Sequence, residues 1–250
     1  MFIAVSMALL TACGNQAADI SASSETGTES IRRGYSDSSQ FPTGSMDPRQ
    51  IVAPQLGLSD EEWDNSRGTV SDGQDTNANQ EPTRILTQDA DSIIIYFSRS
   101  GSTELLASKI QALSGADVFE LVATDPYPSD YGEAVERANS ERGRENVPEL
   151  VGNLPDLSQY KLIYLGYPIW GMTLAEPVAS FVEAYAEQLD GKELVPFSTN
   201  GGYGLGRSVD SIETVLQDAG SQVRMRDAFA VEGNKVDKAD RDLQSWFEIL

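Results

Sequence analysis

A short segment rich in hydroxyl groups, Ser98-Arg99-Ser100-Gly101-Ser102-Thr103, carries residue types that bind phosphate. Its hydroxyls donate hydrogen bonds, and its glycine leaves backbone N–H groups open to a ligand. The segment precedes a stretch with helical spacing, so the positive end of a helix dipole would face the same place. An ordinary helix cap uses the same residue types. The segment therefore predicts either a phosphate-binding loop or a simple cap.

Two further segments combine aromatic side chains with glycine. Gly166-Tyr167-Pro168-Ile169-Trp170-Gly171-Met172 offers a tryptophan on which a planar ring could stack, or which could simply cap the core. Thr199-Asn200-Gly201-Gly202-Tyr203 lets the backbone approach a ligand closely, or forms a plain surface loop. No G-x-G-x-x-G pattern opens the first strand–helix unit, so these glycines are not a dinucleotide fingerprint.

The three segments follow predicted strands of one sheet. Apolar runs predict strands at residues 93–97, 118–122, 162–166, 193–197 and 223–231. Helical spacing predicts helices between and after them, at residues 104–113, 131–142, 178–189, 209–219 and 238–249. This alternation predicts an α/β domain with a doubly wound, five-stranded parallel sheet in the order 2-1-3-4-5 and helices on both faces. Ligands bind at the carboxyl edge of such a sheet, where the three segments meet.

The composition excludes several classes of function. The chain of 250 residues has no histidine and one cysteine, Cys13, so it cannot build a Ser-His-Asp or Cys-His catalytic site. Histidine or cysteine zinc sites and intrachain disulfides are excluded for the same reason. With 39 acidic and 18 basic residues the net charge is −21, which disfavours nucleic acid as a partner.

Together the three segments resemble those of the flavodoxin family, over about residues 91–250. Pro126-Tyr127-Pro128, followed by Tyr131, is similar to the same family. The resemblance implies FMN as the cofactor. We predict no metal site, because the acidic residues lack the spacing of calcium ligands. Its phosphate would lie on Ser98, Ser100, Gly101, Ser102 and Thr103, with a charge contact from Arg99. Its ring system would lie near Tyr167, Pro168, Ile169, Trp170, Gly171, Thr199, Asn200, Gly201, Gly202 and Tyr203, stacked on Trp170.

The resemblance implies electron transfer as the function, with the redox chemistry belonging to the cofactor. The acidic surroundings would disfavour an anionic reduced flavin and so lower the reduction potential of the cofactor. They would also attract a redox partner that has a basic face. Two alternatives remain. One is an NAD(P)H-dependent FMN or quinone reductase on the same fold, and the other is a surface binding module that has no cofactor.

The first 84 residues differ in character from the rest. Residues 1–12 resemble a signal peptide, and Leu10-Thr11-Ala12-Cys13 resembles a bacterial lipobox, although no basic residue precedes the apolar run. This predicts lipidation of Cys13 and a location outside the cytoplasmic membrane. Residues 13–84 are small and polar, which predicts a flexible tether before a domain at 85–250. Within the tether, Ser59 and Glu62 have the spacing of a capping box, which predicts one helical turn or a charged surface cluster.

Overall fold

Four parallel strands of apolar residues form the centre of the sheet. The computed structural model describes residues 44–66, 80–143, 148–152 and 154–250. The central strands are β2 (Ser92–Tyr96), β3 (Asp117–Glu120), β4 (Leu162–Trp170) and β6 (Glu193–Asn200). Side chains alternate between the two faces, so Ile93 and Ile95 join one apolar cluster while Ile94 and Tyr96 join another. Both faces are buried, which explains the unbroken apolar runs.

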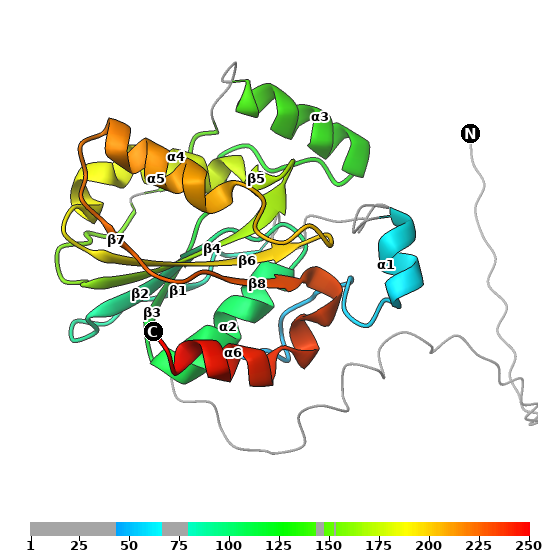
Figure 1. Ribbon diagram of the computed structural model, residues 1–250, viewed down its shortest axis with the longest axis horizontal. Coiled ribbons are helices and arrows are strands. Elements are labelled where there is room, and N and C mark those ends of the chain that lie inside the picture. The colour runs from blue at the N-terminus through cyan, green and yellow to red at the C-terminus, as the bar shows by residue number, and fades with distance from the viewer. Residues whose placement is uncertain (1–43, 67–79, 144–147, 153) are drawn as a thin grey trace, which may run out of the picture. The chain divides into compact units, whose positions relative to one another are not determined.

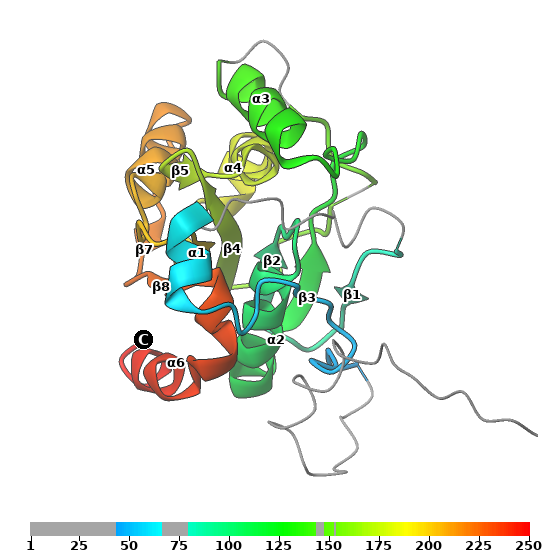
Figure 2. The same ribbon diagram turned by 90° about the vertical axis from the view of Figure 1, so that its right-hand side faces the viewer.

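Helices cover both faces of this sheet (Figures 1 and 2). They are α2 (Ser102–Ser114), α3 (Tyr131–Arg142), α4 (Glu176–Leu189), α5 (Ser208–Asp218) and α6 (Asp240–Phe247), with a 3-10 helix η2 (Gly233–Lys238) before α6. On one face α4 and α5 contribute Phe181 and Ile212 to the core. On the other, α2 and α6 contribute Ile110 and Trp246. The predicted α/β class with helices on both faces is confirmed.

The edges of the sheet are more complex than predicted. The strand order is β1-β3-β2-β4-β6-β7, in which β1 (Arg84–Ile85) is antiparallel to β3. β5 (Thr173–Leu174) pairs with the end of β4. The predicted strand over 223–231 is interrupted and forms β7 (Arg224–Met225) and β8 (Phe229–Glu232), both parallel to β6. At the interruption Trp246 Nε1 donates to the Asp227 carbonyl at 2.8 Å. The sheet therefore has eight strands rather than five.

Residues 44–66, which we call the arm, pack on the domain (Figure 2). Their apolar side chains Met46, Ala53 and Trp63 are buried. The arm ends in α1 (Asp60–Ser66), where the Ser59 backbone N–H donates to Glu62 Oε2 at 2.8 Å, as in a capping box. The predicted flexible tether is therefore wrong for this segment. The sequence gives a weak signal here, because the apolar residues at 51–58 follow no helical or strand spacing and are buried only against a surface formed by the rest of the fold.

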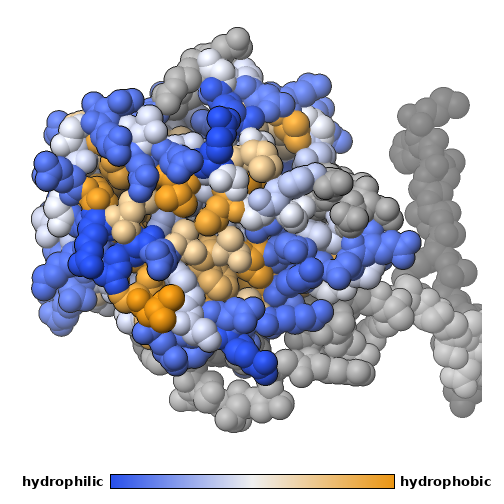
Figure 3. Space-filling model, viewed as in Figure 1, coloured by the Kyte–Doolittle hydropathy of each residue, from blue (hydrophilic) through white to orange (hydrophobic). Residues whose placement is uncertain are grey.

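The predicted signal peptide (1–12) and Cys13 lie outside the described residues. In the part of the chain that is described, no helix has both the length and the apolar character needed to cross a membrane. Figure 3 shows one face of the molecule, which is largely hydrophilic around a central apolar area. That area lies between α5 and α6, over the edge of the sheet that carries β7 and β8.

Candidate functional site

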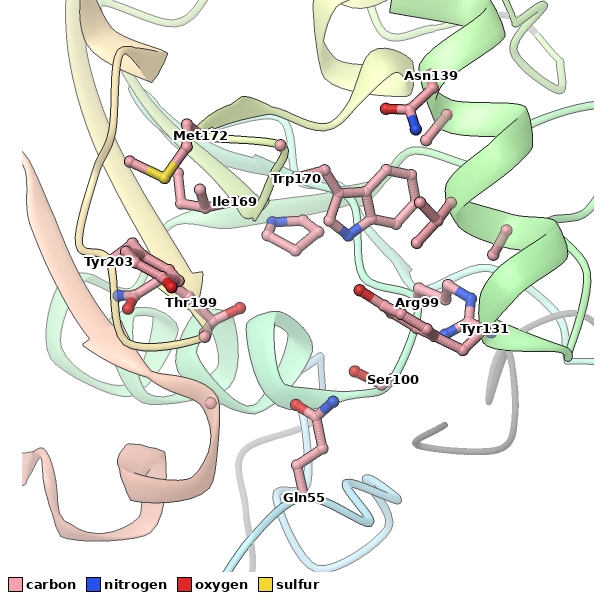
Figure 4. Close-up of a pocket in the computed structure, with 18 of the residues that line it drawn as sticks. Gln55, Arg99, Ser100, Tyr131, Asn139, Ile169, Trp170, Met172, Thr199 and Tyr203 are labelled. Atoms are coloured by element: carbon pink, nitrogen blue, oxygen red, sulfur yellow. The ribbon is translucent and has the colours of Figure 1, made fainter. Parts of the chain in front are cut away.

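A cavity of about 470 Å³ opens at the carboxyl ends of β2, β4 and β6 (Figure 4). This is the edge at which doubly wound sheets bind ligands, and the volume lies within the range of small-molecule sites. The residues predicted for the site that line the cavity are Arg99, Ser100, Pro168, Ile169, Trp170, Gly171, Thr199, Asn200, Gly201 and Tyr203. Those that do not line it are Ser98, Gly101, Ser102, Thr103, Tyr167 and Gly202.

The hydroxyl-rich loop connects β2 to α2 and is well ordered by its own hydrogen bonds. Ser98 Oγ accepts a hydrogen bond from the Gly101 backbone N–H at 3.1 Å, and the Thr103 hydroxyl lies 2.7 Å from that of Thr199. Gly101 has a φ of 80°, a left-handed conformation that favours glycine. Arg99 is buried, and its Nη2 donates to the carbonyl groups of Pro128 and Ser129 at 2.9 and 3.0 Å. Of this loop, Ser100 and Arg99 line the cavity, and they bring to it a hydroxyl and a fixed cation.

The second segment is a strand end rather than a loop. β4 continues through Trp170, and Gly171 and Met172 then turn the chain back into β5, with φ of 54° and 68°. Trp170 lies edge-on to Phe97 and Tyr127, with ring centroids 5.5 and 4.9 Å away. These contacts fix the indole at the cavity wall, where Figure 4 shows it.

Tyr167 lies beneath the site instead of in it. Its side chain is fully buried, and its hydroxyl donates to Ser208 Oγ at 3.2 Å. Burial raises the pKa of Tyr167 to about 12, so the hydroxyl stays protonated at neutral pH. The difference from the prediction arises because Tyr167 packs in the apolar cluster covered by α4 and α5, where its hydroxyl meets Ser208 of α5.

The third segment turns at the end of β6. Asn200 Nδ2 donates to the Val231 carbonyl at 3.0 Å, while its Oδ1 accepts from the backbone N–H groups of Gly202 and Gly204 at 2.8 and 3.1 Å. Asn200 therefore shapes this loop as well as lining the cavity. Tyr203 is half exposed at the rim, where it offers an aromatic face to solvent and to the cavity.

Several cavity residues were not predicted from the sequence. They are Gln55 and Trp63 from the arm, Tyr131, Ala134, Val135, Ala138, Asn139 and Arg142 from α3, and Met172 and Gly233. The α3 residues recur at intervals of three and four, so the helical spacing of residues 131–142 held a signal for a wall of the site. No comparable signal marks Gln55, which lies in a short apolar stretch, residues 51–58, that has neither helical nor strand spacing.

Hydrogen bonds from Arg142 fix the end of α3 against the end of β4. Arg142 Nη2 donates to the Trp170 carbonyl at 3.1 Å, and its Nη1 donates to Asn139 Oδ1 at 2.8 Å. Behind Trp170, the Tyr127 hydroxyl donates to Glu141 Oε2 at 2.5 Å. Burial, reinforced by this contact, raises the pKa of Tyr127 well above its usual range. The aromatic cluster behind the indole is therefore neutral and rigidly held.

The cavity has two chemically different ends. Trp170, Ile169 and Met172 give one end apolar and aromatic surface, while Ser100, Arg99 and Gln55 give the other hydroxyl, cationic and amide groups. Such a site fits an elongated ligand that has a planar ring at one end and an anionic group at the other. Among the described residues, no group of three acidic, cysteine or histidine side chains is arranged to hold a metal ion.

Comparison with known proteins agrees with this description. The family profile described as Flavodoxin matches residues 91–250. A candidate flavoprotein from Bacteroides eggerthii is 26% identical with a TM-score of 0.52, over 64% of this chain and 97% of that chain. Another candidate flavoprotein, from Bacteroides uniformis, is 20% identical with a TM-score of 0.52, over 63% of this chain and 99% of that chain. A Lactobacillus acidophilus flavoprotein, solved in complex with FMN, is 22% identical with a TM-score of 0.49, over 60% of this chain and 97% of that chain. No curated protein sequence matches the chain.

Proposed function

The chain belongs to the flavodoxin family, and from this premise we propose that it binds FMN in the cavity and transfers electrons. The observation that carries the proposal is the meeting of an indole wall and a hydroxyl-rich loop in one cavity of about 470 Å³. FMN has the matching form, with a planar ring system, a polar chain and a terminal phosphate.

The residues would divide the binding between them. Trp170 and Tyr203 would offer aromatic faces to the ring system, and Ile169 and Met172 would exclude water from it. Within the loop at residues 98–103, Ser100 and Arg99 line the cavity and would hold the phosphate through a hydroxyl and a guanidinium. When bound, FMN supplies the redox chemistry by accepting and releasing electrons. The protein would bind and orient it, and the net charge of −14 over residues 85–250 would disfavour extra negative charge on it.

Titration with FMN tests this function. We expect purified full-length chain to bind one equivalent of FMN, to shift its visible absorbance and to release the spectrum of free FMN on unfolding. Riboflavin, which lacks the phosphate, should bind more weakly, because charge-assisted hydrogen bonds to phosphate are lost. A chain that leaves the FMN spectrum unchanged at all concentrations would contradict the proposal.

We also propose that Cys13 carries a lipid anchor, which places the domain outside the cytoplasmic membrane. The lipobox-like sequence that ends at Cys13 supports this location. Two acyl chains on one residue are sufficient for stable membrane attachment. Incorporation of labelled fatty acid into the chain, lost in Cys13→Ser, is the measurement that checks it.

The proposed electron-transfer partner has a basic docking face, because residues 85–250 carry 27 acidic and 13 basic residues, a net charge of −14. Complementary charge speeds encounter, and salt screens it. We expect electron transfer to a basic c-type cytochrome to slow by about tenfold between 10 and 500 mM salt. Transfer to an acidic acceptor of similar potential is the control and should speed up. A rate to the basic acceptor that does not depend on salt would contradict the proposed docking face.

A further inference from the structure

The arm (residues 44–66) lies outside the family-matched residues 91–250, yet it reaches the cavity. It is held at both sides of the hydroxyl-rich loop. On α2, Gln111 Oε1 accepts from the Met46 backbone N–H at 2.7 Å. On η2, Asn234 Nδ2 donates to the Leu58 carbonyl at 3.1 Å, and Lys235 Nζ lies 2.9 Å from Asp60 Oδ1. The arm therefore crosses the loop between two fixed attachments.

The arm also touches the loop itself. A Cβ atom added to Gly101 would lie only 1.9 Å from the Val52 carbonyl oxygen, so the two backbones are in close contact. Ser102 Oγ donates a long hydrogen bond of 3.4 Å to Gln55 Oε1. Ser102 is 2% exposed and Gln55 is 9% exposed. The polar end of the cavity is thus closed by the arm rather than by the family domain alone.

Gln55 enters the cavity at this closed end. It lines the cavity together with Trp63, and Figure 4 shows its amide nitrogen on the side of Ser100. A glutamine amide carries N–H donors, the kind of group that binds phosphate oxygens, and it adds no negative charge. This matters in a chain with a net charge of −21, where a carboxylate at the same position would repel an anionic ligand.

We propose that the arm is part of the cofactor site and that Gln55 binds the phosphate-bearing end of the flavin. The inference rests on the proposed function, since it assumes that FMN occupies the cavity. The arm thereby makes affinity depend on the phosphate: it closes the end of the cavity that FMN fills and that riboflavin leaves empty. Gln55 is a binding residue that lies outside the family domain.

The test is the variant Gln55→Glu in the full-length chain, titrated with FMN and with riboflavin. The change keeps the shape of the side chain, removes the N–H donors and adds a negative charge beside the phosphate. We expect the Kd for FMN to rise at least about tenfold, since charged hydrogen bonds contribute about 1.5–3 kcal/mol. The Kd for riboflavin should stay within about twofold.

Gln50→Glu is the matched control, because Gln50 lies on the same arm but is exposed and does not line the cavity. It makes the same chemical change and should leave both dissociation constants unchanged. Gln55→Ala removes the amide without adding charge, and it provides a second readout if Gln55→Glu unfolds. It should weaken FMN binding by about threefold or more and leave riboflavin binding unchanged.

Three outcomes would overturn the inference. Tighter FMN binding in the Gln55 variants would show that the arm blocks the site, and unchanged FMN binding would show that it only packs nearby. Equal losses for FMN and riboflavin would show that Gln55 acts on the fold instead of on the phosphate. If the wild-type chain binds neither flavin, the proposed function itself fails, and that result is distinct from the first three because it appears before any variant is made.

Discussion

Trp170→Ala is expected to weaken FMN binding by roughly 5- to 150-fold. Stacking of a planar base on an aromatic side chain contributes about 1–3 kcal/mol, and each 1.4 kcal/mol corresponds to tenfold in Kd. The full contribution is expected here because the indole is held in place before the ligand binds. Phe97 and Tyr127 pack edge-on against the indole, and Arg142 donates a hydrogen bond to the backbone carbonyl of Trp170. Fluorescence titration with FMN measures the change.

Trp170→Phe is the control for this change. It keeps an aromatic face on the cavity wall and should retain most of the affinity. The potential offers a second readout. The negative face of the indole disfavours extra negative charge on a stacked flavin ring. Removing the indole should therefore raise the reduction potential of the bound flavin. Unchanged affinity in Trp170→Ala, with an unfolding free energy that shows the chain folded, would exclude Trp170 as the stacking face.

The elements that position the site were predictable because their physical signals are local. Ile93, Ile94 and Ile95 are consecutive apolar residues, as in a strand that is covered on both faces, and all three are buried. The carboxyl edge of such a sheet is where its ligands bind, so three segments separated in sequence could be assigned to one place. The cavity lies at that edge and is lined by Arg99, Trp170 and Thr199 among others.

One missed feature is a local turn, and the others depend on contacts between distant segments. Gly171 and Met172 adopt positive φ and return the chain into β5, which extends β4 through Trp170. Tyr167 is buried because it packs against α4 and α5, which follow it in the chain, and its hydroxyl donates to Ser208. The packing of the arm depends on η2 and α2, which follow it in the chain, as in the bond between Asn234 and the Leu58 carbonyl. Composition alone suggested disorder there, because it does not register a surface supplied by other residues.

Gly101→Ala is expected to displace the arm and to destabilise the fold by about 2–5 kcal/mol. A left-handed conformation costs an ordinary residue about 1–2 kcal/mol, and forced overlap adds about 1–3 kcal/mol. Gly101 has a φ of 80°, and a Cβ there would lie 1.9 and 2.8 Å from the carbonyl oxygen and carbon of Val52. Both are backbone atoms, so no side-chain rotation relieves the overlap, and the arm must move. Urea unfolding measures the loss of stability.

Gly115→Ala separates the overlap from the backbone strain. Gly115 lies at the other end of α2 with a φ of 67°, and nothing lies within 4 Å of its would-be Cβ atom. This variant should lose only about 1–2 kcal/mol and keep its affinity for FMN. Trypsin cleavage after Arg49, an exposed residue of the arm, reports on the arm itself and should accelerate only in Gly101→Ala. Both variants carry the same strain, so equal cleavage rates would mean that the Val52 contact does not hold the arm over the loop.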